Sequence, residues 1–416
     1  MRPVDLSPIA PEQQTGTPVD LFLIFVGANI VATTLQVGAS LPPSFSLGVA
    51  LTVIGVGAIG GAALTAVLAP IGTRLRVPSI VAARAPLGKS GAQALALLLF
   101  VTNFAWIALN NVIAASISVR LTGIGSTGVW AVALGLVATV IVLGGPRAAA
   151  LVDRVAVPVL LAAGVVFTLA CLRVPWPAWP SGPSSAGDVV HGLDVVTGYQ
   201  VSWLLMFADY SRYTRSGGAA ATAVFAGLAI PALWLMPVGW SLARIAGSDD
   251  PGTMLAAAGV AWWTAVLITL ASVTTNFVNI YLSSLAWRTL APRSTGAGSV
   301  WTIGLIGTAL GLISSGWLTR FAEFMVLLGS ILVPVGGVFL AHFVLLRKPI
   351  DLARIYNPAS LAAFNIAGMA AWIAGFVVYK LAAPIGATLP ALATSMAVYA
   401  LLAARQHDAV VTQNSH

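Results

Sequence analysis

Residues 198–213 read GYQVSWLLMFADYSRY. The stretch carries a tyrosine, a glutamine and a serine inside an otherwise apolar run, and it ends in a group of charged and aromatic residues. Polar groups at membrane depth normally face a protein interior or a water-filled path. The stretch therefore predicts a helix that lines a solute pathway, as in a membrane transporter.

The composition identifies an integral membrane protein. Of 416 residues, 58% are hydrophobic and 8% are charged, and the mean hydropathy is +0.95, which excludes a soluble domain of this length. A helix needs about 20 apolar residues to span hydrocarbon. The sequence predicts twelve such spans, near residues 20–41, 47–70, 92–119, 127–144, 152–172, 192–210, 217–245, 256–287, 299–317, 321–346, 361–383 and 387–404.

The spans divide the chain without leaving room for a soluble domain. Residues 1–19 are predicted to form a cytoplasmic tail, and residues 20–346 a transport core of ten helices. Residues 347–404 hold the last two helices, and residues 405–416 form a second cytoplasmic tail.

The net charge of +8 raises the question of a nucleic-acid partner, but the distribution of charge argues against one. With the N-terminus inside, the outer loops and helix ends hold only Arg120, Arg173, Arg244, Arg320 and Lys380 of the 20 Lys and Arg residues. This is the positive-inside bias of a membrane protein. We therefore expect a multi-pass protein of the cell inner membrane with both termini in the cytoplasm.

The longest predicted outer loop, residues 173–191, is rich in proline and tryptophan. Tryptophan is common at the membrane interface, so the loop is either an interfacial rim or an outer lid. Cys171 is the single cysteine, which excludes a disulfide framework and a cysteine metal cluster.

Two spans are predicted to be discontinuous. In the first, glycines at positions 27 and 38 enclose the polar run from Asn29 to Gln36. In the sixth, Gly198 precedes the polar residues. Interrupted helices five spans apart are typical of a five-plus-five inverted repeat, and unwound backbone lining a cavity can bind a cation or a substrate.

The third and eighth spans carry side chains suited to ligand binding. Trp106 and Asn110 are four residues apart and share a helix face, so an indole and an amide could bind a planar heterocycle. In the eighth span, Thr274 and Thr275 could give neutral oxygens to Na⁺, and Asn276 and Asn279 share a face. The alternative is that these side chains bond to their own helix or join neighbouring helices.

Charge and catalytic groups are missing from the span midpoints. All twelve acidic residues fall in loops, tails or helix ends, which disfavours a proton relay and a cationic substrate. A neutral polar substrate is expected. The sequence contains no constellation of a nucleophile and a base, so we expect neither an enzyme nor a cofactor.

Asp209 and Arg212 end the sixth span on its predicted cytoplasmic side. They form either an inner gate or an ordinary solvated helix terminus, and their spacing does not distinguish the two.

At residues 207–213, FADYSRY, the chain resembles the nucleobase:cation symporter-1 family of cytosine, purine, allantoin and hydantoin permeases. The resemblance extends over essentially the whole chain. It implies an all-α polytopic membrane protein of LeuT-like fold, with twelve helices, an inverted repeat and broken helices 1 and 6. It also implies alternating access driven by Na⁺ or H⁺.

The resemblance also implies roles for individual residues. The family's substrate tryptophan and amide on the third span match Trp106 and Asn110, and its pair on the sixth span falls on Tyr199 and Gln200. The second of that pair is aromatic in relatives, so Gln200 is a departure that affects stacking on both faces of a ring. The expected substrate asparagine of the eighth span is Asn276, with Asn279 as an addition. The expected Na⁺ ligands are the carbonyls of Val31, Thr34 and Ala271 and the hydroxyls of Thr274 and Thr275.

These expectations describe a symporter that imports a neutral nucleobase, either a cytosine-like pyrimidine or a purine, together with Na⁺. The alternatives are a hydroxymethylpyrimidine, allantoin or hydantoin substrate, or coupling to H⁺. We expect the protein to function as a monomer, with a small heterocycle and the lipid bilayer as its partners.

Overall fold

The structure is a computed structural model that describes residues 7–143, 145–178, 183–259, 296–313, 318–357 and 360–413. Between residues 260 and 295 it describes 262, 266, 269–270, 272–273, 275–277, 279–280, 283–284 and 287. For residues 145–157, 160 and 405–413 it describes the backbone.

The regular secondary structure of the described residues is helical, apart from one isolated bridge between Gly16 and Thr214. The α-helices are α1 (Pro18–Asn29), α2 (Ala32–Ala39), α3 (Leu47–Leu75), α4 (Ser79–Ala82), α5 (Arg84–Thr122), α6 (Thr127–Leu143), α7 (Gly145–Arg173), α8 (Ala186–Val201), α9 (Gly217–Ala246), α10 (Pro251–Ala257), α12 (Gly296–Ile313), α13 (Phe321–Phe339), α14 (Leu352–Tyr356), α15 (Ile366–Leu381) and α16 (Thr388–Gln413). Short 3₁₀ helices are η1 (Pro11–Gln13), η2 (Ser202–Met206), η3 (Ser211–Tyr213) and η5 (Ala383–Ile385), and η4 (Leu340–Leu345) is a π-helix.

The ends of the long helices follow from local sequence. The hydroxyls of Ser46, Ser185 and Ser216 accept hydrogen bonds from amides in the first turns of α3, α8 and α9. Gly123 and Gly247 take the left-handed conformation that ends α5 and α9.

Several helices are suited to a bilayer. Within the part of the chain that the structure describes, four segments are long and apolar enough to span it: Leu47–Leu75, Arg84–Thr122, Gly217–Ala246 and Phe321–Leu345. The helices α1 and α2 meet the same criterion as a pair, with a bend of 57° between them. Shorter apolar helices occupy five further predicted spans: Thr127–Leu143, Leu161–Arg173, Gly296–Leu312, Ile366–Leu381 and Thr388–Ala404. The count of twelve spans stays a prediction, since 14 of the 32 residues of the predicted eighth span lie outside the described residues.

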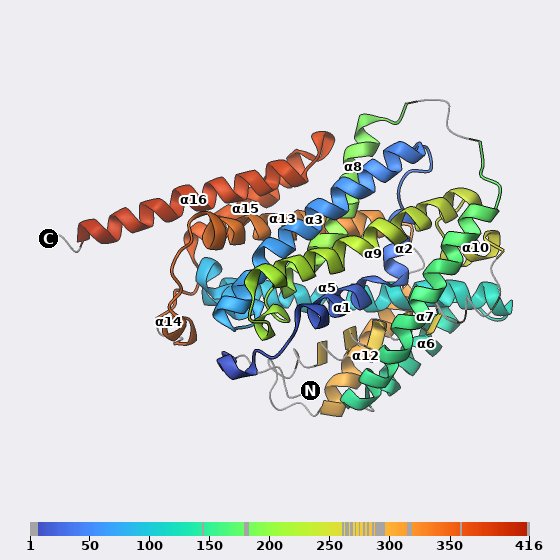
Figure 1. Cartoon of the computed structure of the whole chain (residues 1–416), viewed down its shortest axis with the longest axis horizontal. Helices are drawn as coiled ribbons and strands as arrows, with labels where there is room; N and C mark the ends of the chain where they lie inside the picture. The colour runs from blue at the N-terminus through green and yellow to red at the C-terminus, as the bar shows by residue number, and fades with distance from the viewer. Residues whose placement is uncertain are drawn as a thin grey trace.

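Two groups of packed helices each take members from both halves of the chain. In one group α9 packs on α1, α2 and α3, and α3 also packs on α8. In the other group α5, α6 and α12 pack on one another. Figure 1 shows α6, α7 and α12 at one end of the molecule and α15 and α16 at the other. This packing of early helices on late ones agrees with the inverted repeat that the sequence predicts.

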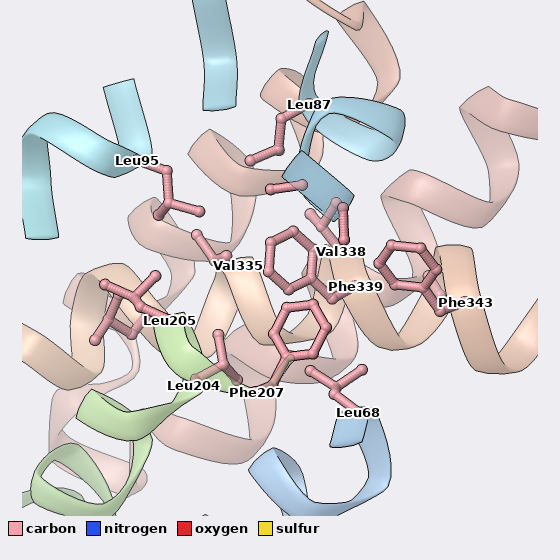
Figure 2. Close-up of a cluster of buried hydrophobic side chains, with 14 of the residues drawn as sticks. Leu68, Leu87, Leu95, Leu204, Leu205, Phe207, Val335, Val338, Phe339 and Phe343 are labelled. Atoms are coloured by element: carbon pink, nitrogen blue, oxygen red, sulfur yellow. The ribbon is translucent and has the colours of Figure 1, made fainter. Parts of the chain in front are cut away.

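A large apolar core joins these groups to α13. Leu68 of α3, Leu95 of α5 and Phe207 converge on Val335 and Phe339 of α13 (Figure 2). The rings of Phe207 and Phe339 lie 5.6 Å apart in an edge-on arrangement. Phe207, which contributes to this core, comes directly after η2 in the sixth span.

The sixth span differs from its predicted form. The α8 helix continues through Gly198 to Val201, and the change to a 3₁₀ helix comes only at Ser202. Gly198 lies against α13, where a Cβ atom would overlap the backbone carbonyl of Met325. This glycine therefore serves close helix packing.

The last helix is longer than its predicted span. The sequence predicts an end near residue 404 and a tail beyond it, whereas α16 continues to Gln413.

Candidate functional site

The first span is broken where the sequence predicts a break. The α1 helix ends at Asn29, Val31 is extended (φ −138°, ψ 161°), and α2 begins at Ala32. The Thr34 hydroxyl donates to the Asn29 carbonyl at 2.6 Å, and the Thr34 amide donates to the Val31 carbonyl at 3.0 Å. A carbonyl has two lone pairs, so the Val31 oxygen can still bind a cation.

Tyr199 connects the sixth span to this break. Its hydroxyl lies 2.7 Å from the Thr34 Oγ1 and 3.5 Å from the Thr33 Oγ1. Because the single hydroxyl hydrogen of Thr34 is donated to Asn29, the tyrosine must be the donor in the shorter contact. The tyrosine hydroxyl thus holds Thr34 in place.

Aromatic rings from three spans meet at Trp106 of α5. Its ring centroid is 5.9 Å from that of Tyr199 and 5.4 Å from that of Phe324 on α13, both edge-on. Trp106 is partly exposed, whereas Tyr199 is buried. The sequence did not identify Phe324, since nothing distinguishes it from a core residue before the contact is known.

Amide side chains lie on α5 and on the eighth span beside it. The Asn110 amide donates to the Trp106 carbonyl at 2.9 Å, and its Oδ1 is buried without a hydrogen-bond partner. On the eighth span, the Asn276 amide donates to the Ile107 carbonyl at 3.1 Å and to the Asn111 Oδ1 at 2.6 Å. Asn111 is not among the residues predicted from the sequence, although the Asn110-Asn111 doublet is a signal for it.

These contacts join Thr34, Tyr199, Trp106 and Asn110. Asn276 bonds instead to Ile107 and Asn111 of α5, and Gln200 faces elsewhere. Its amide donates to the Leu228 carbonyl of α9 at 3.1 Å, and it packs against Gly61 of α3. Adjacent helix residues point about 100° apart, so Tyr199 and Gln200 face different neighbours.

The remaining predicted residues are less well placed. Thr275 and Asn279 are helical and partly buried. Ala271 and Thr274 lie outside the described residues.

An apolar crevice runs beside the break in the first span, lined by Val31, Leu35, Gly164 and Phe167, among others.

The predicted inner gate lies against the segment between the second and third spans. The Asp209 carboxylate accepts from the Ser79 amide at 3.3 Å, and the Ser79 hydroxyl accepts from the Ala208 amide at 2.8 Å. The buried Arg212 stacks on Tyr213, with 4.9 Å from its guanidinium to the ring centroid.

The N-terminal segment crosses the same region. The Gln14 amide donates to the carbonyls of Thr73, Arg212 and Thr214 at 2.9, 3.1 and 2.9 Å. The end of the sixth span is therefore held by neighbouring segments rather than solvated.

The outer loop packs onto the end of α9. The Arg244 guanidinium donates to the carbonyls of Pro43 at 2.8 Å and Ala178 at 2.5 Å, and the Trp176 ring lies 6.2 Å from that of Trp240.

Comparison with known proteins assigns the chain to a family. The model of the permeases for cytosine and purines, uracil, thiamine and allantoin matches residues 8–402. The chain belongs to this family. It is 25% identical to the cytosine permease of Escherichia coli K12 over an alignment of 373 residues, which covers 86% of each chain.

Solved structures support the same fold. The chain superimposes on the inward-facing conformation of Mhp1 with a TM-score of 0.81 at 18% identity, covering 98% of this chain and 95% of Mhp1. A closed conformation of Mhp1, a nucleobase-cation-symport-1 family transporter with bromovinylhydantoin bound, gives 0.77 at 18% identity and covers 96% and 94%. These findings confirm the resemblance to the nucleobase:cation symporters and the LeuT-like, all-α fold. This member of the permease family is a multi-pass membrane transporter rather than an enzyme.

Proposed function

We propose that this permease imports a neutral nucleobase, a cytosine-like pyrimidine or a purine, by Na⁺-coupled symport with alternating access. It would do so as a monomer in the cell inner membrane, with both termini in the cytoplasm. The observation that carries the proposal is the meeting of Trp106, Tyr199 and Thr34 from three spans, one of them broken.

The side chains of this site suit a flat, uncharged ring. Trp106 would offer an indole, and Asn110, Asn276 and Asn279 would offer amide groups from α5 and the eighth span. Each hydrogen bond to such a ring contributes about 0.5–1.5 kcal/mol after desolvation, so modest affinity is expected. Gln200 would act indirectly, by packing the sixth span against α3 and α9.

The proposed Na⁺ site adjoins the substrate site. Its ligands would be the carbonyls of Val31, Thr34 and Ala271 and the hydroxyls of Thr274 and Thr275. Thr34 supports the coupling, because its hydroxyl accepts from Tyr199 while its carbonyl would bind the cation. Coupling between two ligands is reciprocal, so substrate and Na⁺ would raise each other's affinity by the same factor.

Transport requires the inner end of the sixth span to move. Asp209 is bonded to Ser79, and Arg212 lies under Tyr213 and the N-terminal segment. We propose that these contacts form the inner gate and that they break when the substrate is released to the cytoplasm.

The proposal is tested by thermal stabilisation of the purified full chain against cytosine, uracil, hypoxanthine, allantoin, hydantoin and a hydroxymethylpyrimidine. Each compound is measured in NaCl and in KCl of equal concentration. We expect one nucleobase to stabilise the protein more in NaCl. Equal stabilisation in both salts would refute Na⁺ coupling, and failure of every nucleobase would refute the substrate class. Trp106→Ala provides the control for binding outside the site.

A further inference from the structure

Two neighbouring carboxylates follow the end of α9, on the side that the proposed topology places outside the cell. Asp249 and Asp250 are both partly buried, in the linker that leads into α10. The Asp250 carboxylate accepts from the Ser116 hydroxyl of α5 at 2.5 Å and from the amide and hydroxyl of Thr253 at 2.8 and 2.7 Å. These bonds fix the position of one negative charge in the linker.

Asp249 has no such donors. Within the part of the chain that the structure describes, no other residue donates a hydrogen bond to its carboxylate. Burial raises the pKa of this carboxyl, and the adjacent charge of Asp250 raises the pKa further. Arg120 of α5, a basic side chain bonded to this linker, donates to the Thr253 hydroxyl at 3.0 Å rather than to either carboxylate. A cation bound beside the two carboxylates would relieve their repulsion.

An amide from the first span lies against the same linker. Gln36 of α2 is 1% exposed, and its nitrogen donates to the Asp249 carbonyl at 3.0 Å. A backbone carbonyl can only accept a hydrogen bond, so this contact fixes the orientation of the amide. The Gln36 Oε1 is buried without a hydrogen-bond partner. Such oxygens cost free energy and are few in native structures, so this one indicates a place for an ion or a water molecule.

The linker is held where α2, α5 and α9 meet. Ala39, Ile117, Leu242 and Met254 of α2, α5, α9 and α10 belong to one apolar cluster. Gly252 packs so closely on α5 that a Cβ atom there would overlap the Ser116 carbonyl. The backbone that carries the two carboxylates is therefore fixed by packing, as a binding site requires.

From these contacts we propose that Asp249, Asp250 and the Gln36 oxygen form a site for Na⁺ at the outer end of the first span. Hard cations prefer oxygen ligands, and Ca²⁺ takes about six to eight of them, more than these three side chains offer. Gln36 lies about one turn of α2, roughly 5 Å, beyond Ala32 at the break. An ion held here is thus concentrated close to the proposed transport site. The inference rests on the proposed function only in the choice of Na⁺ as the ion.

The first test is amide hydrogen exchange of the purified full chain in NaCl and in KCl of equal concentration, without substrate. Na⁺ should slow exchange over residues 247–257 by about threefold or more, because the ion joins the linker to α2. Asp249→Asn keeps the shape of the side chain and should abolish this protection, and Gln36→Leu should weaken it. Asp188→Asn is the control, since it neutralises an exposed carboxylate at the start of α8, and it should retain the protection.

Two results of this test would overturn the site. The first is equal exchange over residues 247–257 in the two salts, and the second is equal protection by Na⁺ in the wild type and in Asp249→Asn. Protection by CaCl₂ at concentrations where Na⁺ has no effect would overturn the choice of a monovalent ion.

Thr275→Ala separates this site from the proposed function. It removes a ligand of the proposed transport site but none of the linker site, so Na⁺ should still protect residues 247–257. Loss of that protection in Thr275→Ala would show that the linker responds to the deeper ion, and it would overturn a separate site. Uptake that is independent of Na⁺, with the linker still protected by Na⁺, would refute the proposed coupling alone.

A second test measures uptake at low ionic strength as a function of Na⁺, with choline chloride as the balancing salt. Asp249→Asn should raise the Na⁺ concentration for half-maximal uptake about three- to tenfold and retain the rate at saturating Na⁺, because the carboxylate increases the local concentration of cations. The difference should shrink as ionic strength rises. The same shift in Asp188→Asn, or no shift in Asp249→Asn, would overturn the role of the site in supplying Na⁺.

Discussion

Tyr199→Phe isolates the link between the substrate site and the proposed cation site. The variant keeps the ring that faces Trp106 and removes only the hydroxyl that donates to Thr34 at 2.7 Å. A hydrogen bond of this kind contributes about 0.5–1.5 kcal/mol. Without it Thr34 is held less firmly, and we expect Na⁺ binding to weaken by about 1 kcal/mol. Because 1.4 kcal/mol corresponds to a factor of ten, the Na⁺ concentration for half-maximal uptake should rise about fivefold.

The assay is uptake of the radiolabelled substrate into proteoliposomes as a function of external Na⁺. Substrate affinity at saturating Na⁺ should change by less than about twofold, since the ring is retained. Tyr399→Phe is the control, because it removes a buried tyrosine hydroxyl bonded to His342 at 2.6 Å, far from Thr34 in the sequence and on a different helix. A normal Na⁺ response in Tyr199→Phe, or the same shift in Tyr399→Phe, would refute the reasoning.

Three further substitutions test the site and the packing. Trp106→Ala should abolish saturable uptake while leaving the circular dichroism spectrum unchanged. Wild-type uptake by this variant would show that the indole is not part of the site. Thr275→Ala should raise the Na⁺ concentration for half-maximal uptake. An unchanged Na⁺ titration would show that Thr275 is not a ligand of the cation. Gly198→Ala should lower the free energy of unfolding by about 1–3 kcal/mol, because its Cβ would overlap the Met325 carbonyl. Thermal denaturation should show no such loss in Gly60→Ala, where α3 has open space, and equal melting of the two variants would contradict the packing argument.

The break in the first span could be predicted because composition and conformation agree there. Polar residues between two glycines mark a segment that a lipid-facing helix would not contain, and the backbone leaves the helix at Ile30 and Val31. The sequence located this break to within a few residues. Helical spacing likewise predicted that Trp106 and Asn110 share a face, and the Asn110 amide reaches back to the Trp106 carbonyl.

The sixth span could not be predicted as well, because a glycine permits both unwinding and close packing. Only the carbonyl of Met325, more than a hundred residues away, identifies the role of Gly198. The direction of Gln200 depends in the same way on Leu228 and Gly61 of other helices. Periodicity places a residue on a face, but it does not state which helix covers that face.

The sixth span is held at both ends, which limits where it can bend. In its outer half, the Asp194 carboxylate accepts from the amides of Ala387 and Thr388 at 3.0 and 3.1 Å and from the Thr388 hydroxyl at 2.7 Å. A carboxylate at these amides stabilises the start of α16, so the last helix anchors α8. At the inner end, Asp209 is bonded to the Ser79 amide.

Between these anchors the helix changes from α to 3₁₀ at Ser202, where hydrogen bonding is poorer. We expect alternating access to bend the span there, with the Asp209 contact of the proposed inner gate breaking and the Asp194 contact, which consists of three hydrogen bonds, persisting. Amide hydrogen exchange should then be faster over residues 202–210 than over residues 188–200. Equal protection of the two segments would mean that the span moves as one rigid body, and the anchor at α16 would have to break during transport.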